Sequence, residues 1–454
     1  MNRGDGAREM KLRRIALWAL LLSSGAGCTG TSPAAPEAHE AVPVEPMPAD
    51  PRVEEPAARL LTPHEEAQRA LFATASNAFA FDFWAKVRST PGNLAVSPAS
   101  IEMALAMTYG GAAGQTRHAM ARTLHVEGEE ASFQQAAGRQ LAAWNDPDRE
   151  SYELRVANRL FGERSYALVP EFLTLTRTTY AAPMELVDFR HHPDGVRTHI
   201  NSYVSDFTNA RITNLLPPAS VTPDTRLVVT NAVYMKAQWR SPFEQNMTRP
   251  APFHVDGATT TEPRPTMHQF AHFPCASVDG VKLLELPYQG DDLSMLIVLP
   301  DALDGLEAVE SGLTAARLQT WLAALATARV GVALPKFSVD PPEPTRLHTP
   351  LAELGMAIAF DPAHADFTDM ARPPSPDERL YISEVFHKAF VVVDEAGTEA
   401  AAATAVVMMR GTGMPEPALP FNVDHPFLFL IRDVHSGAIL FLGRIVDPHA
   451  AEAE

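Results

Sequence analysis

The sequence predicts an α+β fold in one domain that spans residues 64–449. Stretches with apolar residues at helical spacing alternate with short apolar runs that are typical of buried strands. No internal repeat and no second linker divides this region. The last two apolar runs, 426–431 and 439–445, flank the turn residues His-Ser-Gly and predict a closing pair of strands.

The composition is that of a globular protein, with 46% apolar and 20% charged residues. A formal net charge of −18 argues against a general affinity for nucleic acid and favours solubility. The chain has two cysteines, Cys28 and Cys275, and Cys28 belongs to the leader described next. No disulfide is therefore expected, and stability must come from core packing.

Residues 1–28 have the features of an export signal. Five basic residues between positions 3 and 14 precede the apolar run Ile15–Leu22, which is too short to remain as a membrane-spanning helix. Small residues follow, and then Cys28, which resembles the lipidated cysteine of bacterial lipoproteins; Gly25 departs from the leucine that this class prefers. We expect export, either as a cell-envelope lipoprotein anchored through Cys28 or as an extracellular protein. A retained membrane anchor is the third alternative.

Residues 29–63 predict a disordered linker. They contain eight prolines among alanine and glutamate, a composition that cannot bury enough apolar surface to fold and that keeps the chain extended. Together with Cys28, the linker predicts a tether that holds the domain off a membrane. The alternative is a disordered leader without a role.

Within the domain, the apolar periodicity and the turn residues predict a mixed series of elements. Pro98 marks a helix start, and the glycines at 110–111 mark its end. Asn231 stands out as a polar residue inside the buried run RLVVTNAVYM. The predicted helices are 67–87, 101–109, 115–124, 170–180, 196–207, 318–325 and 350–359. The predicted strands are 93–96, 152–161, 226–235, 283–287, 293–299, 330–337, 379–386, 391–394, 426–431 and 439–445.

Residues 395–412 (EAGTEAAAATAVVMMRGT) fit neither a core element nor an ordinary linker. Alanines 400–403 alone favour helix, whereas Gly397 and the β-branched residues further on favour extended structure. From Thr398 onward the even positions carry small or apolar side chains, and Glu399 begins the odd set. Alternate side chains of a strand face opposite sides, so the even set would face a core and Glu399 would face water. The segment has the pattern of a strand that a sheet can gain.

Further stretches, taken together with residues 395–412, point to one family. They are AVSPASI (95–101), NAVYMKAQWRSPF (231–243), APFHVDG (251–257), FNVDHPFLFLI (421–431) and FLGRIVDP (441–448). Each is weak alone, but in this order they resemble the serpin family over nearly all of residues 67–448. The resemblance implies the serpin fold, with three β-sheets, eight or nine helices and an exposed reactive-centre loop.

The resemblance also implies a mechanism. A serine protease attacks the exposed loop as a substrate and forms an acyl-enzyme. The cleaved loop then inserts into the large sheet as a new strand and carries the protease with it, so that deacylation stalls. The inhibitor supplies no catalytic group.

Carried over to this chain, the resemblance assigns roles to two groups of residues. The loop hinge comprises Glu395, Gly397, Thr398, Ala400, Ala401, Ala402, Ala403 and Thr404, and Ala396 departs from the charged residue usual in the family. The shutter, a polar cluster beneath the place where the sheet opens, comprises Ser97, Ser100, Asn231 and His387. Trp239 matches the breach, the tryptophan position beneath the point where the loop inserts. Each of these residues also has an ordinary structural alternative when it is taken singly. Ser100 would cap a helix, His387 would be a hydrogen-bonded histidine of the core, and Trp239 would be an ordinary core residue.

The sequence leaves undecided which of several neighbouring bonds a protease would cleave. Counting seventeen residues from Glu395 reaches Gly411, which gives the bond Gly411–Thr412. The bond after Arg410 is one residue earlier, and a trypsin-like pocket with a buried carboxylate would select it strongly. Met409 would suit a chymotrypsin-like pocket. A trypsin-like target is the favoured one.

Two other classes of function compete with an inhibitor. The first is a non-inhibitory serpin that acts as a binding or chaperone module, against which Gly397 and the alanine run argue. The second is an enzyme, which is disfavoured because the sequence has no G-x-S-x-G or H-E-x-x-H motif and its 16 histidines lack metal-binding spacing. We expect a monomer without cofactor or metal, whose partner is a serine protease held in a covalent complex.

Overall fold

The computed structural model describes residues 62–146, 149–258, 261–375, 378–399 and 417–449, and these belong to one compact unit. The predictions for the leader with Cys28, for residues 29–61 of the linker, for the alanines 400–403 with Thr404, and for the bond region 409–412 lie outside the described residues. No helix in the described ranges is long and apolar enough to span a membrane.

The described elements are nine α-helices and nineteen strands, with short 3-10 and π-helical turns between them. The helices are α1 (Pro63–Val87), α2 (Pro98–Tyr109), α3 (Gly114–Thr123), α4 (Glu130–Trp144), α5 (Pro170–Thr178), α6 (Pro193–Phe207), α7 (Leu306–Ser311), α8 (Ala315–Ala324) and α9 (His348–Leu351). The strands are β1 (Leu94–Val96), β2 (Tyr152–Glu163), β3 (Ala167–Leu168), β4 (Glu185–Val187), β5 (Leu227–Gln238), β6 (Arg249–Phe253), β7 (Glu262–Val278), β8 (Val281–Pro287), β9 (Leu293–Pro300), β10 (Ala326–Pro335), β11 (Phe337–Val339), β12 (Thr345–Arg346), β13 (Ala371–Arg372), β14 (Glu384–Ala389), β15 (Val391–Val393), β16 (Gly397–Thr398), β17 (Leu419–Asn422), β18 (Phe427–Asp433) and β19 (Ile439–Ile445).

The strands form three sheets, as the serpin resemblance implied. An eight-stranded sheet, here called the central sheet, contains β2, β4, β5, β11, β12, β14, β15 and β16. A nine-stranded sheet runs in the order β1-β19-β18-β9-β8-β7-β10-β17, with β6 paired to β7. The third sheet pairs only β3 with β13.

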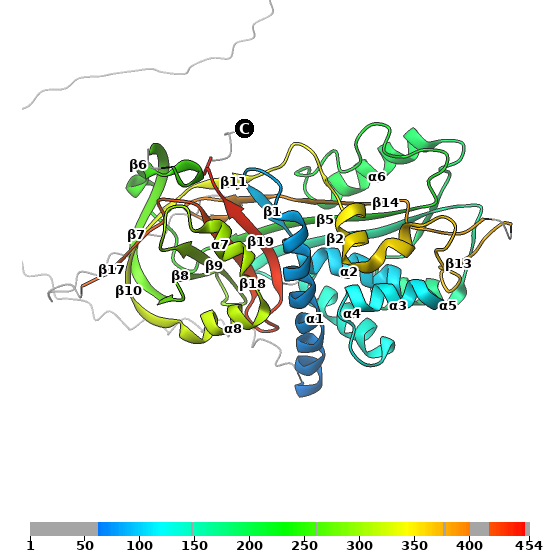
Figure 1. Ribbon diagram of the computed structural model, residues 1–454, viewed down its shortest axis with the longest axis horizontal. Coiled ribbons are helices and arrows are strands. Elements are labelled where there is room, and N and C mark those ends of the chain that lie inside the picture. The colour runs from blue at the N-terminus through cyan, green and yellow to red at the C-terminus, as the bar shows by residue number, and fades with distance from the viewer. Residues whose placement is uncertain (1–61, 147–148, 259–260, 376–377, 400–416, 450–454) are drawn as a thin grey trace, which may run out of the picture. The chain divides into compact units, whose positions relative to one another are not determined.

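Strand β5 lies in the middle of the central sheet (Figure 1). One of its edges pairs antiparallel with β2, and its other edge pairs parallel with β14. Helix α6 covers one face, where its Ile200 packs in the same apolar cluster as Val228 and Ala232 of β5. The intervening side chains, such as Val229 and Val233, belong to the main core on the other face. Because both faces are buried from Leu227 to Met235, this part of β5 is mostly apolar rather than alternating, with Thr230 and Asn231 as its buried polar residues.

Several sequence predictions of elements need correction. The predicted strand 379–386 begins only at Glu384, and the predicted helix 350–359 breaks into short turns at Gly355, whose φ is +113°. Helix α4 and the 17-residue strand β7 were not predicted as elements. Tertiary packing defines β7, which gains its length by pairing with β6, β8 and β10.

Helix α2 is buried on every side, and it carries one ionisable residue into the core. Glu102 is 0% exposed, and neither of its carboxyl oxygens has a well-formed hydrogen bond. Burial raises the pKa of Glu102 well above its usual range, and the neighbouring Ser76 hydroxyl lowers it less. Burial thus favours the neutral, protonated form of Glu102 in the folded protein.

We expect Glu102→Gln to remove a pH-dependent loss of stability. The folded-state pKa is raised, so the carboxyl group supports the fold below its unfolded pKa, and this support is lost as the pH rises toward the folded pKa. Above about pH 4.5, the unfolding temperature of the wild type should therefore fall relative to that of the variant, by up to about 2 °C per pH unit. Thermal unfolding from pH 4.5 to 8 measures this, with the exposed Glu307→Gln as the control for loss of one charge. A constant gap across that range would contradict the assignment.

Candidate functional site

The hinge follows β15 and turns back, so that its first residues lie between β15 and β5 of the central sheet. Gly397 and Thr398 form β16, and Thr398 pairs with Val393 of β15 on one side and with Ala237 of β5 on the other. The sequence pattern predicted a strand without a sheet. In the structure the first two residues of this strand already lie in the sheet.

Gly397 occupies a position that no other residue fits. Its φ is +157°, and a Cβ atom built on it would lie 2.0 Å from the carbonyl oxygen of Ala237. The backbones of β16 and β5 can approach this closely only because Gly397 has no side chain.

Thr398 is buried at 1% exposure, on the core side of the sheet, as expected for the first even position of the hinge. Its Oγ1 lies 2.6 Å from the hydroxyl of Tyr288. Tyr288 in turn stacks on Trp239, with ring centroids 4.5 Å apart and planes 12° apart. Trp239 donates its indole N–H to the carbonyl oxygen of Asp394 at 3.0 Å. Trp239 therefore lies directly at the hinge, and Tyr288 is a residue there that the sequence analysis did not single out.

Glu395 anchors the start of the hinge. Its carboxylate lies 2.8 Å from the Lys336 ammonium and accepts a hydrogen bond from the Thr248 hydroxyl at 2.7 Å. Burial raises the pKa of Glu395, but the bonds from Lys336 and Thr248 outweigh it and leave the pKa lowered. Its carbonyl oxygen also accepts the Phe243 N–H at 2.8 Å, so both the side chain and the backbone of Glu395 are fixed.

The expectation that Glu399 faces water is wrong. Its backbone turns in the left-handed region, with φ +48°, and its side chain is only 13% exposed. The carboxylate accepts a hydrogen bond from Arg211 at 2.5 Å. Arg211 belongs to the segment after α6, so a residue distant in sequence decides where this side chain lies.

Below the hinge, the central sheet is parted over a short distance. β14 pairs with β5 as far as Val233, and β16 pairs with β5 from Ala237 onward. Among the described residues, β5 positions 234–236 therefore have no strand partner on that edge. Within the described part of the chain, this edge of β5 is therefore open directly ahead of the hinge.

The four predicted shutter residues come together beyond this opening, and each is at most 1% exposed. Asn231 of β5 donates its amide to the Ser100 hydroxyl at 2.6 Å and accepts from the His387 ring at 2.5 Å. The backbone N–H of Ser97 donates to Nε2 of His387 at 3.1 Å. Strand β5, strand β14 and the start of α2 are thus joined by one buried hydrogen-bond network.

The network fixes the protonation state of His387. Because Nε2 accepts from Ser97, the ring proton must lie on Nδ1, which donates to Asn231. Burial lowers the pKa of His387 to about 3, so the ring is neutral. Both ring nitrogens are satisfied only in this neutral form.

Asn158 is a further member of the network that the sequence analysis missed. It lies opposite Asn231 in the register of β2 and β5, and its Oδ1 accepts from the Asn231 amide at 2.5 Å. Its own amide donates to the carbonyl oxygen of Ser100 at 3.0 Å. The run 152–161 also contains Glu153, Arg155 and Arg159, so Asn158 does not stand out there as Asn231 does in its apolar run.

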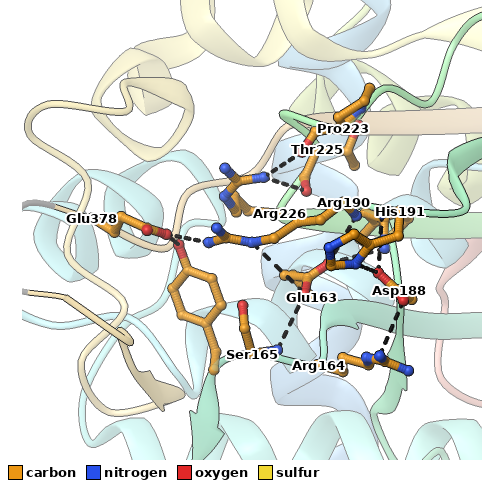
Figure 2. A network of polar contacts seen from close by, with 12 residues as sticks. Glu163, Arg164, Ser165, Asp188, Arg190, His191, Pro223, Thr225, Arg226 and Glu378 are labelled. Atoms are coloured by element: carbon orange, nitrogen blue, oxygen red, sulfur yellow. Dashed lines mark hydrogen bonds and ion pairs between the residues drawn. The ribbon is translucent and has the colours of Figure 1, made fainter.

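A second polar cluster fixes the far end of the central sheet (Figure 2). Glu163, the last residue of β2, is 2% exposed and accepts the backbone N–H groups of Ser165 and Phe189 at 3.2 and 2.9 Å. Arg190 pairs with Glu378, which precedes β14. The contacts of Glu163 and Arg190 therefore connect the end of β2 with the segment that precedes β14.

The comparisons with known proteins agree with this architecture. The sequence model of the serpin family, described as serine protease inhibitor, matches residues 74–448. The chain belongs to the serpin family.

Individual relatives match over most of their length. The leukocyte elastase inhibitor of Homo sapiens is 39% identical over 388 residues, covering 83% of this chain and 99% of that protein. An uncharacterised serpin-like protein of Thermococcus kodakarensis is 38% identical over 386 residues, covering 85% and 87%. The crystal structure of uncleaved ovalbumin superimposes with a TM-score of 0.73 at 29% identity, covering 83% of this chain and 100% of that one.

Proposed function

We propose that this serpin is an irreversible suicide-substrate inhibitor of serine proteases. The observation that carries the proposal is the hinge. Gly397 and Thr398 already form a strand between β15 and β5, next to positions 234–236 of β5, which pair with no other described strand on that edge. Among the described strands, none occupies the edge of β5 that a chain continuing from Thr398 would meet. Each residue that inserts gains backbone hydrogen bonds worth about 1 kcal/mol each, which supplies a driving force.

The covalent step uses the protease's own chemistry. The protease serine attacks the carbonyl carbon of the bait residue, an ester forms, and the peptide C–N bond breaks. The protease histidine delivers the proton to the departing amine, which becomes a new N-terminus. Insertion of some 16 residues at about 3.3 Å each would carry the acylated protease roughly 50 Å and distort its active site before water hydrolyses the ester.

The proposed bait residue is Arg410 or Gly411, and a trypsin-like protease is the favoured target. The described residues do not include the bait, so this part rests on the sequence. The buried carboxylate of a trypsin-like pocket supports Arg410 over its neighbours.

We further propose that the protein is exported and held at the cell envelope by a lipid on Cys28, with release as the alternative. The basic and apolar leader and the proline-rich linker support this location. Membrane fractionation of cells that express wild type or Cys28→Ser tests it. A wild-type protein that stays in the soluble fraction would exclude the anchor.

The inhibitory function is tested by mixing the protein with trypsin. An SDS-stable complex of the summed masses is expected, and mass spectrometry of the released C-terminal fragment should give Gly411 or Thr412 as its first residue. Cleavage without any complex, repeated with chymotrypsin and pancreatic elastase, would instead favour the non-inhibitory alternative, a binding or chaperone module.

A further inference from the structure

The ion pair between Glu399 and Arg211 lies at the point from which further insertion of the loop would start. Arg211 donates from Nε to a carboxylate oxygen of Glu399 at 2.5 Å, and the Glu399 side chain is 13% exposed. The Arg211 guanidinium also lies 5.8 Å from the centroid of the Phe390 ring. The second carboxylate oxygen of Glu399 is buried without a hydrogen-bond partner among the described residues. Arg211 therefore supplies the hydrogen bond that this carboxylate makes in the described structure.

The backbone on both sides of this ion pair lies in the left-handed region. Glu399 has a φ of +48°, and the two residues before Arg211, Asn209 and Ala210, have φ values of +51° and +61°. Residues other than glycine rarely adopt this conformation, and clusters of them occur where strain serves a function. A strand cannot continue through Glu399 while the residue keeps this φ, because extended backbone needs a strongly negative φ. The ion pair thus coincides with the bend that stops β16.

The register of β16 shows where Glu399 would lie after the next step of insertion. β16 is antiparallel to β5, with Gly397 opposite Gln238 and Thr398 opposite Ala237. Continuing this register by one residue places Glu399 opposite Lys236. Lys236 is one of the three positions of β5 that have no described strand partner on that edge. Insertion of one more residue therefore brings Glu399 beside Lys236.

The side chains of Glu399 and Lys236 would then lie on the same face of the sheet. Alternate residues of β5, such as Val228 and Ala232, pack in the apolar cluster with α6, and Lys236 continues this series. Thr398 faces the core, so an extended Glu399 would face the α6 side as well. Residues directly opposite each other in antiparallel strands have Cβ atoms about 4.5–5.5 Å apart, and opposite charges there stabilise the pair. Lys236 is thus placed to pair with the inserted Glu399.

The charge of Lys236 already acts on Glu399 in the described structure. Burial raises the pKa of Glu399, and the hydrogen bond and charge of Arg211 and the charge of Lys236 lower it by less. Glu153 is the other charged group that acts on Glu399, and it lies opposite Lys236 on the β2 side of β5. Because Glu153 keeps this place before and after insertion, it does not decide between the two basic partners.

We propose that Glu399 exchanges Arg211 for Lys236 as its ion-pair partner in the first step of insertion. Arg211 is a positioning residue that holds the hinge with two residues inserted, and Lys236 is a positioning residue that stabilises the third inserted residue. The two basic residues therefore act on the rate of insertion in opposite directions. This inference rests on the proposed inhibitory function and adds to it the charge exchange that sets when the loop starts to move.

The test measures the rate of insertion in variants that lose one charge. Arg211→Gln removes the partner of the bent hinge, so insertion should become about fivefold faster, whereas Lys236→Gln removes the partner of the inserted strand and should make it about fivefold slower. The readout is the limiting first-order rate constant for inactivation of trypsin at saturating inhibitor, or of chymotrypsin or pancreatic elastase if the wild type traps these instead.

Arg164→Gln is the matched control. Arg164 also pairs an exposed guanidinium with a mostly buried carboxylate, that of Asp188, but at the far end of the central sheet (Figure 2). Its replacement removes one positive charge and one ion pair without touching the hinge. We expect the rate constant of this variant to equal that of the wild type.

Glu399→Gln provides the background that separates a charge exchange from a general effect on the fold. Without the shared carboxylate, Arg211→Gln and Lys236→Gln should each change the rate constant by less than about twofold. A merely structural role of Arg211 or Lys236 would persist in this background.

The possible outcomes separate the two proposals. Unchanged rate constants, effects of the same sign in Arg211→Gln and Lys236→Gln, or effects that persist with Glu399→Gln would each overturn the exchange and leave the inhibitory function intact. A wild type that traps none of the three proteases would remove the inhibitory function and this inference with it. Opposite effects that vanish in the Glu399→Gln background would establish the exchange.

Discussion

Replacing Thr398 with arginine is expected to abolish covalent trapping while the loop remains cleavable. Thr398 is 1% exposed between two strands, and its hydroxyl lies 2.6 Å from that of Tyr288. An arginine at this position must either bury its charge without a partner, which costs several kcal/mol, or leave the sheet. In both cases the inserting loop lacks its first inserted residue. Hydrolysis of the acyl-enzyme should then be faster than insertion of the loop.

The readout is the number of inhibitor molecules cleaved per protease trapped. We expect complex formation with trypsin to fall by at least about a hundredfold relative to cleavage for Thr398→Arg. Thr398→Ser keeps the hydroxyl that faces Tyr288 and is the matched control, which should trap protease like the wild type. Undiminished complex formation by Thr398→Arg would show that this residue is not the leading residue of insertion.

Removal of the Asn231 amide is expected to lower the thermal stability of the intact protein more than that of the loop-cleaved protein. Asn231→Ala leaves Asn158, Ser100 and His387 without their shared partner in a fully buried site. Loss of such a network costs about 3 kcal/mol, or several degrees in unfolding temperature. Insertion of the loop between β5 and β14 would separate Asn231 from His387, so the cleaved form no longer depends on this bond.

Thermal unfolding of the intact and loop-cleaved forms measures this difference. Asn201→Ala is the matched control, because Asn201 on α6 is also buried and makes two hydrogen bonds to the backbone of Leu216. The control should lower the unfolding temperature of both forms alike. If Asn231→Ala also lowers the unfolding temperature of both forms equally, the network is ordinary core structure and does not hold the sheet shut.

The sequence was informative about the elements that local pattern governs. The helix started by Pro98, the apolar strand with Asn231 and the closing strand pair lie where periodicity and turn residues predicted. Predictions failed where local pattern and packing disagree. Residues 379–383 belong to no strand of the described structure, although Ser383 donates its backbone N–H to the carbonyl oxygen of Leu227, the first residue of β5, at 3.0 Å. Strand β7 alternates poorly, yet it is long because three strands flank it.

The candidate site shows the same division. Gly397 and Thr398 follow from the sequence, because a close backbone approach requires glycine and a buried strand position requires a small side chain. The motifs named the polar residues of the shutter singly, but only the fold brings α2, β5 and β14 together. Asn158, Tyr288 and Arg211 join the site from distant segments through pairing across strands and through one ion pair.

By itself, the sequence determined the fold family, because its motifs occur in the order that is typical of the family. It also determined the small, alternating pattern of the hinge, which depends on residue size and on local periodicity. Only the tertiary structure decided how far the hinge is inserted, because that depends on how β5, β14 and β15 are spaced. It also decided that Glu399 turns toward Arg211 instead of water, since the partner is 188 residues away along the chain. Long-range pairing of this kind leaves no trace in local pattern, and it sets the state from which the loop would move.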